Sequence, residues 1–304
     1  MAVLLLSGIA GTARPAGADG NCTSDTRVFA VAAETGHLVE IPSCPDGFGA
    51  AVEVDGGDWR GYHATFAVRD GAAAIIYAVT ASGELWWRRQ TAAGGPLVGA
   101  TRVGSAVNWA QPVVFGAWAG YLYTGGGQGQ KVRTFHHLEW QTGGPAVTEE
   151  PYLFGPLRGP LITGMATSFH AAVAIWNGMS FRVWRIHPRN SKIDDDVWYL
   201  SGNLPDGVTS VVGDGIWMHA VNAVGAVVLL SQTPPGSPPD PRYGRQDTRP
   251  WQAWATSPGH YVRVVVPVRG SDSGSPFVAA PQATCMGCAG GEDGNPWEWQ
   301  SVGT

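Results

Sequence analysis

The feature that most constrains this chain is a pattern that returns about every 47 residues. In each copy a short apolar strand is followed by a Gly-containing turn and a second strand, as in "IIYAVTASGELWWRR". A fixed period of this length is typical of folds in which one supersecondary unit is copied along the chain. The equivalent positions, at successive steps of 48, 46, 51 and 45 residues, are Phe29, Tyr77, Tyr123, Ala174 and His219.

Two further apolar segments bring each copy to four strands. One follows the second strand, as in "GATRVG", and the other precedes the next copy. The preceding segments, which we expect to be inner strands, are "YHATFAV", "QPVVFG", "ITGMATS", "TSVVGDG" and "YVRVVVPV". A four-stranded sheet cannot bury both of its faces alone, but copies set radially around an axis cover one another. The repeat therefore predicts an all-β fold, a five-bladed β-propeller of four-stranded antiparallel sheets, because tandem β-sandwiches would repeat about every 100 residues.

The chain begins on the second strand type and ends on an inner one. We therefore expect "YVRVVVPV" to complete the first sheet and close the ring, with residues 19–269 as the propeller domain. Residues 270–304 would then be a C-terminal closing segment packed on the propeller. Six blades, with "PFVAA" and "WEWQ" in the last sheet, is the alternative.

The N-terminus indicates secretion. A short apolar run is followed by small residues that end in Ala16-Gly17-Ala18, which is typical of a signal peptide covering residues 1–18. The run is too short to span a bilayer, so we expect a secreted protein without membrane insertion. An ordinary N-terminal strand is the alternative.

Four cysteines lie near the two ends of the chain. In an oxidising compartment an even number favours two disulfides of unknown connectivity, and a zinc site at "CMGC" is the alternative. The cysteines are Cys22, Cys44, Cys285 and Cys288.

Charge and composition argue against several other functions. The net charge is −5 and no large basic cluster is present, so nucleic acid is not an expected partner. We expect no metal and no cofactor. The carboxylates of 194–196 are interpreted as a solvated turn, and His136 and His137 would point to opposite faces of a strand.

Two units carry a more specific motif: "DGGDWRGYHATFAVRDGAAAIIYAV" at 55–79 and "RVGSAVNWAQPVVFGAWAGYLYTG" at 102–125. This combination of Gly-rich turn, Trp, aromatic inner strand and "lYaV" strand resembles the tachylectin family of lectins. The resemblance implies a five-bladed propeller that binds N-acetylated sugars such as N-acetylglucosamine at several equivalent sites between blades.

The candidate sugar-binding residues recur with the repeat. A sugar ring needs an aromatic platform for its C–H face and positioned polar groups for its hydroxyls. Tryptophans at such turns can instead serve only for packing between blades. The candidates are Asp58, Trp59, His63, Tyr77, Asn108, Trp109, Tyr123 and Trp251.

These features together predict a secreted carbohydrate-binding protein whose partners are glycans. Repeated shallow sites on one rigid body can bind a multivalent surface tightly. Two other classes remain open: a propeller-fold secreted enzyme acting on glycans or another small molecule at a single axial site, and a protein-binding scaffold.

Overall fold

The computed structural model describes residues 27–44, 47–111, 113–116, 120–125, 132–154, 161–166, 171–176, 181–187, 192–202, 204–208, 210–213, 218–231 and 251–268. Apart from the short 3-10 helix η1 (Trp59–Gly61), the regular elements within these residues are all strands, which confirms the predicted all-β class. None of the described residues forms a helix long and apolar enough to cross a membrane. The predicted signal peptide, the segment 270–304 and the disulfides lie outside the described side chains, so these remain predictions.

Three four-stranded sheets follow the chain without interruption, each with its strands in sequence order. The first of these contains β9 (Val113–Gly116), β10 (Tyr121–Gly125), β11 (Val132–His137) and β12 (Val147–Phe154). The next contains β13 (Leu161–Ala166), β14 (Ala171–Trp176), β15 (Phe181–His187) and β16 (Lys192–Gly202). The last contains β17 (Val211–Gly213), β18 (Met218–Val221), β19 (Val227–Ser231) and β20 (Gln252–Thr256).

The remaining two sheets each take a strand from the C-terminal part of the chain. One contains β1 (Arg27–Ala32), β2 (Leu38–Cys44), β3 (Gly47–Phe48) and β4 (Val52–Asp55), with β21 (Tyr261–Val265) antiparallel to β1. The other contains β5 (Tyr62–Asp70), β6 (Ala73–Thr80), β7 (Leu85–Gln90) and β8 (Leu97–Val103), with β22 (Pro267–Val268) parallel to β5.

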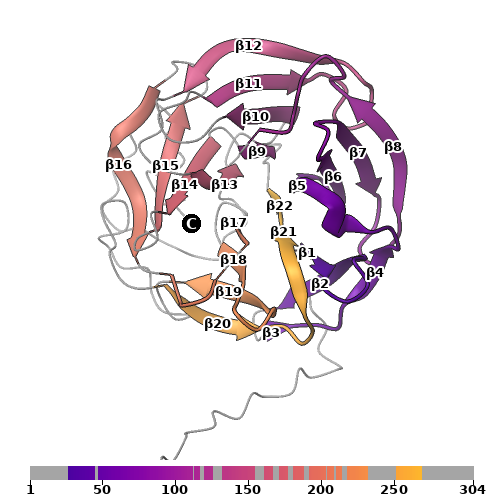
Figure 1. Ribbon diagram of the computed structural model, residues 1–304, viewed down its shortest axis with the longest axis vertical. Helices are drawn as coiled ribbons and strands as arrows, with labels where there is room; N and C mark the ends of the chain where they lie inside the picture. The colour runs from indigo at the N-terminus through magenta and orange to yellow at the C-terminus, as the bar shows by residue number, and fades with distance from the viewer. Residues whose placement is uncertain are drawn as a thin grey trace, which may run out of the picture.

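The five sheets lie side by side around a common centre, giving a propeller-like arrangement (Figure 1). The strands β5, β9, β13, β17 and β21, with β22 that follows β21, are nearest the centre, and β8, β12, β16 and β20 form the rim. Each of the five segments predicted to be an inner strand contributes one of the central strands. One prediction was wrong: residues 194–196 lie within β16 and not in a turn, because the strand continues through them and pairs with β15 on both sides, at Ile193 and at Trp198.

The strand register confirms the predicted repeat. Each of its five reference residues lies on the second strand of a sheet and faces a residue of the inner strand. The second strand is therefore the same structural element in every copy. The pairs are Phe29 with Val265, Tyr77 with Phe66, Tyr123 with Phe115, Ala174 with Thr163, and His219 with Val212.

Each second strand needs cover on both faces, and β6 shows how the cover is supplied. Seven of its eight residues are buried. Ile76 packs with Phe29 of the first sheet, whereas Tyr77 packs with Phe135 of the following sheet. Burying a large apolar side chain stabilises the fold by about 1.5–3 kcal/mol, so neighbouring sheets hold each other in place.

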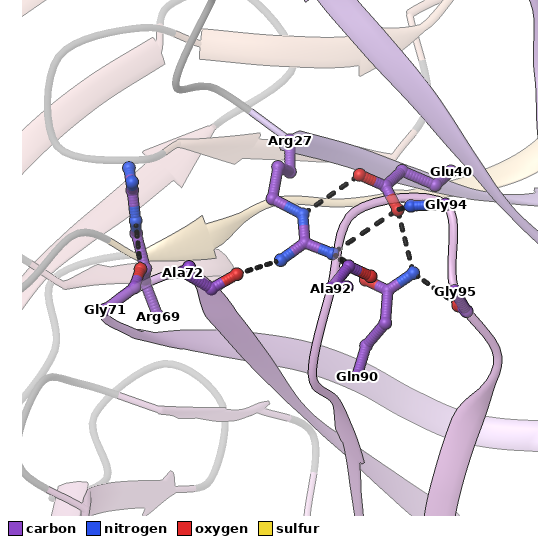
Figure 2. Close-up of polar contacts among 9 residues, drawn as sticks. All are labelled: Arg27, Glu40, Arg69, Gly71, Ala72, Gln90, Ala92, Gly94 and Gly95. Atoms are coloured by element: carbon purple, nitrogen blue, oxygen red, sulfur yellow. Dashed lines mark hydrogen bonds and ion pairs between the residues drawn. The ribbon is translucent and has the colours of Figure 1, made fainter.

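A buried polar cluster joins the first sheet to the second. The Arg27 guanidinium donates to Glu40 Oε1 at 2.9 Å, to the carbonyl of Ala72 at 2.7 Å and to Gln90 Oε1 (Figure 2). The second carboxylate oxygen of Glu40 accepts from Gln90 Nε2 at 2.8 Å and from Gly94 N at 2.7 Å. Arg27 and Glu40 of the first sheet thus bond to residues of the second sheet, so the cluster is a cross-link between the two sheets.

The next junction has its own version of this cross-link. His137 and Gln90 hold equivalent places on their third strands. Each lies three residues after the residue that pairs with the repeat tyrosine, which is Tyr123 in one sheet and Tyr77 in the other. His137 Nε2 lies 2.6 Å from the carbonyl of Gly144, to which it must donate, so Nδ1 accepts from the hydroxyl of Tyr77 at 2.8 Å. Burial lowers the pKa of His137 more than the bond to Gly144 raises it, which keeps the ring neutral.

Replacing Glu40 tests the first cross-link. Glu40→Ala leaves the Arg27 charge buried without its counter-charge, so we expect the free energy of unfolding to fall by about 3 kcal/mol or more. Glu149→Ala, which removes the partner of Arg133 in a half-exposed pair, should cost about 1 kcal/mol or less. Urea unfolding measures both values, and equal losses would contradict the assignment.

The same carboxylate should make stability depend on pH. Burial alone would raise the pKa of Glu40, but hydrogen bonds from Arg27, Gly94 and Gln90 outweigh it and hold the pKa below its ordinary value of 4.5. A carboxyl with a lower pKa in the folded state contributes stability above its unfolded pKa and loses it as the pH falls through the folded value. The stability difference between the wild type and Glu40→Gln should therefore shrink below about pH 4.5. Urea unfolding at several pH values checks this, and a constant difference would refute it.

Candidate functional site

One end of the propeller-like body brings together loops from successive sheets. We call it the loop end and define it as residues 33–37, 56–63, 80–84, 104–111, 222–226 and 257–261. At three hairpins of this end, a glycine carbonyl accepts a backbone hydrogen bond from the segment that leads into the next inner strand. The backbone N–H of Trp59 donates to the carbonyl of Gly36 at 2.8 Å, that of Trp109 to Gly83 at 3.1 Å, and that of Tyr261 to Gly225 at 2.6 Å. The same docking contact thus occurs at three junctions between sheets.

Glycine at the hairpins is required for this docking. Gly36 has φ 78° and Gly83 has φ 86°, a region that L side chains rarely adopt. A Cβ at Gly36 would lie 2.2 Å from Asp58 Oδ1, and one at Gly83 would lie 2.1 Å from Asn108 Oδ1. The missing side chain therefore makes room for the aspartate or asparagine of the next turn.

Asp58 and Asn108 hold equivalent places, as the sequence predicted. Asp58 Oδ1 accepts from the backbone N–H of Arg60 at 3.1 Å, and Asn108 Oδ1 accepts from that of Ala110 at 3.0 Å. This side-chain-to-backbone bond is the usual reason for Asp or Asn at a tight turn. Both side chains are exposed at the loop end.

The two turn tryptophans are buried. Trp59 is 1% exposed and Trp109 is 0% exposed, and their indole N–H groups donate to Asp55 and to the carbonyl of Gly104. Trp109 packs against Phe135 of its own sheet, with the ring centroids 5.0 Å apart. Neither ring is open to a sugar, so both occupy the packing role that was the alternative for them.

The other aromatic candidates are also placed inside. Tyr77 and Tyr123 are fully buried on second strands, and desolvation raises the pKa of both hydroxyls. Trp251 is buried and directly precedes β20, the outer strand of its sheet, so it does not lie at a docking turn. Its expected place is taken by Tyr261, which makes the third docking bond.

Polar groups therefore dominate what the loop end offers a ligand. At the second junction the exposed His63 donates from Nε2 to the carbonyl of Gln111 at 2.8 Å, which leaves Nδ1 as an acceptor. The Asn108 side chain uses only its oxygen in the turn, and its NH₂ group has no partner among the described residues. This junction can exchange neutral hydrogen bonds with a hydroxyl or an amide.

The first junction is chemically different. Arg60 donates to both oxygens of Asp58, at 2.9 and 3.0 Å, and to the carbonyls of Ala33 and Glu34. These hydrogen bonds lower the pKa of Asp58 and raise that of Arg60. The carboxylate is thus occupied by its own neighbour, so Asp58 is a weaker candidate for ligand binding than Asn108.

No metal centre is formed by the described residues, which contain no group of three or more His, Cys, Asp or Glu that could hold an ion. Three residues of the loop end were missed by the sequence interpretation: Arg60, Gln111 and Tyr261. Tyr261 was missed because the sequence interpretation looked for Trp at the docking turn. The docking contact is a backbone hydrogen bond to the hairpin glycine, so it does not require Trp.

Comparisons with known proteins give little further guidance. No protein-family model matches the chain, and a search of curated proteins finds no match. Among solved structures, a putative 6-phosphogluconolactonase from Bacteroides uniformis is 12% identical with a TM-score of 0.35, covering 77% of this chain and 68% of that one. Hsv2 from Kluyveromyces marxianus is 11% identical with a TM-score of 0.28, and the chain covers 65% of its length. Similarities this weak carry no argument about activity.

Substituting a hairpin glycine tests the docking contact. Both Gly83→Ala and Gly71→Ala force alanine to positive φ, at about 1–2 kcal/mol each. A Cβ at Gly71 meets nothing within 4 Å, whereas one at Gly83 collides with Asn108. We expect Gly83→Ala to lower the free energy of unfolding by clearly more than Gly71→Ala in urea titrations. Equal effects would mean that the hairpin does not carry the docked turn.

Proposed function

We propose that the five sheets form a closed five-bladed β-propeller that is secreted and binds glycans at its loop end. Support for the ring comes from the pairing of β21 with β1, in which Val265 lies opposite Phe29 as inner-strand residues do in the other sheets. In this arrangement the last inner strand supplies the missing strand of the first sheet. A propeller closed in this way leaves only short, protected strand edges.

The observation that carries the functional proposal is the repetition of one exposed polar turn at neighbouring junctions. Asp58 and Asn108 are placed alike by two hairpins of the same design. A ligand with repeated, chemically similar groups suits a surface with repeated sites, because several weak contacts combine into strong binding. Glycans are ligands of this kind.

The chemistry of the second junction supports an N-acetylated sugar, the class that the tachylectin resemblance implies. An acetamido group carries one carbonyl acceptor and one N–H donor. The free NH₂ of Asn108 suits the carbonyl, and Nδ1 of His63 suits the N–H. Binding here would depend on hydrogen bonds and not on stacking, since Trp59 and Trp109 are buried.

A protein-binding scaffold receives less support. The large apolar side chains that are exposed in the described part of the chain are few: Val52, Val98, Leu138, Val224 and Val262. Scattered apolar residues of this kind are normal on a soluble surface and do not indicate a protein interface.

Asn108→Asp is the sharpest test of glycan binding. Aspartate fills the equivalent turn as Asp58, so the fold should be kept while the NH₂ donors are lost. We expect the full chain to be retained on an array of glycans that bear N-acetylglucosamine, and the variant to lose retention about tenfold or more. Glu149→Gln, an exposed change on the rim, is the matched control and should bind as the wild type. Retention of Asn108→Asp at the wild-type level would exclude this junction, and failure of the wild type to bind any glycan would exclude the function.

A further inference from the structure

One position of the inner strands is occupied by a charged residue in only one of the four sheets whose described residues show it. To find it, we count two residues on from the reference residue of the repeat, which gives Val31, Val79 and Gly125 in three of the sheets. The position is the inner-strand residue that pairs with each of these. Its occupants there are Arg263, Ala64 and Val113. In the last sheet the corresponding residue Val221 donates its N–H to the carbonyl of Ser210. In the three other sheets where the described residues show this place, a small or apolar residue occupies it, and Arg263 is the exception.

A second exception stands on the neighbouring inner strand. Each reference residue of the repeat pairs with a residue of the inner strand. The residue directly before that partner is β-branched in all five sheets. It is apolar in four of them and carries a hydroxyl only in the second sheet. The five residues are Thr65, Val114, Ile162, Val211 and Val264.

The two exceptions meet in space. Arg263 Nη1 donates to Thr65 Oγ1 at 3.0 Å, and Nη2 donates to the carbonyl of Tyr62 at 2.8 Å. Both acceptors are neutral, and Arg263 forms no ion pair with any carboxylate of the described residues. Arg263 is half-buried, and burial lowers its pKa, but a guanidinium keeps its charge in proteins.

A partly desolvated charge is unfavourable when no counter-charge stands beside it, and the described residues supply none, so this arrangement favours an incoming anion. A guanidinium has five N–H bonds, of which two are used here, and the planar group can bind an oxyanion with two parallel hydrogen bonds. The Thr65 hydroxyl accepts from Arg263 and keeps its own hydrogen for a further acceptor.

We propose that Arg263 and Thr65 form an oxyanion subsite at the inner edge of the junction between the first two sheets. It lies between β21 and β5, which are both next to the centre of the body (Figure 1). The ligand carries a carboxylate, as an acidic sugar does, or is a sulfate or phosphate group. The subsite exists once in the repeat and does not depend on the neutral glycan binding proposed above.

Isothermal titration of the full chain, at ionic strength matched with sodium chloride, tests the subsite. The probes are sodium glucuronate, sodium sulfate and sodium phosphate, with glucose as the neutral counterpart of glucuronate. We expect at least one oxyanion to bind the wild type and its affinity to fall about tenfold or more in Arg263→Gln. Stronger binding of glucuronate identifies an acidic sugar as the ligand class, and stronger binding of the inorganic ions identifies a simple oxyanion. No binding of any oxyanion to the wild type overturns the proposal.

Two further variants keep the test decisive. Thr65→Val has nearly the same shape and installs the residue type of the other sheets, so it should fold and bind the oxyanion several-fold more weakly, even if Arg263→Gln does not fold. Unchanged affinity in Thr65→Val refutes the subsite if Arg263→Gln also binds as the wild type or does not fold. Arg133→Gln makes the same charge change at an exposed position of β11, and an equal loss there would show general attraction by charge instead. Retention of Asn108→Asp on N-acetylglucosamine is measured separately, so failure of one proposal does not imply failure of the other.

Discussion

The fold depends on covering the second strand of every sheet on both faces. In β6 the residues alternate between two apolar clusters, one shared with the sheet before and one shared with the sheet after. A sheet with only one neighbour would expose one complete set of these side chains to water, and an isolated sheet would expose both. Each sheet therefore needs two neighbours, which is why copying the unit and setting the copies around a centre is a stable solution.

Apolar contacts alone would let adjacent sheets slide, and the buried polar links restrict that movement. Gln90 and His137 hold equivalent places on third strands, and each donates to a glycine carbonyl in the loop that follows, Gly95 or Gly144. Each also reaches the preceding sheet, through Arg27 and Glu40 in one case and Tyr77 in the other. Hydrogen bonds have defined directions, so these links set the relative position of sheets and hence of the turns at the loop end.

The sequence was sufficient for the elements of the fold because the repeat is local. The strand–turn–strand pattern identified the second strands and the five central strands, and the register agrees with the alignment of Phe29, Tyr77 and Tyr123. Other features depend on contacts between sheets and could not be read from the pattern. Burial of Trp59 and Trp109 is decided by what the neighbouring sheet places over them, and the Arg27–Glu40–Gln90 cluster joins residues that are up to 63 positions apart.

The repeat also helps to separate structural from functional residues. Residues that recur serve the structure: the hairpin glycines make the docking contact that three junctions share, and the turn tryptophans at two of them are buried in the packing. The docking turn fixes the backbone and one side-chain oxygen, but it does not fix the other polar atoms of the turn residue. Both carboxylate oxygens of Asp58 accept from Arg60, whereas the NH₂ of Asn108 faces no described acceptor. Structurally equivalent junctions are therefore unequal as binding sites, and the number of sheets is an upper limit to the number of sites. Ligand contacts should be sought where the copies differ, as they do at Asn108 and at the Thr65–Arg263 pair, because identical residues are already explained by the packing that the copies share.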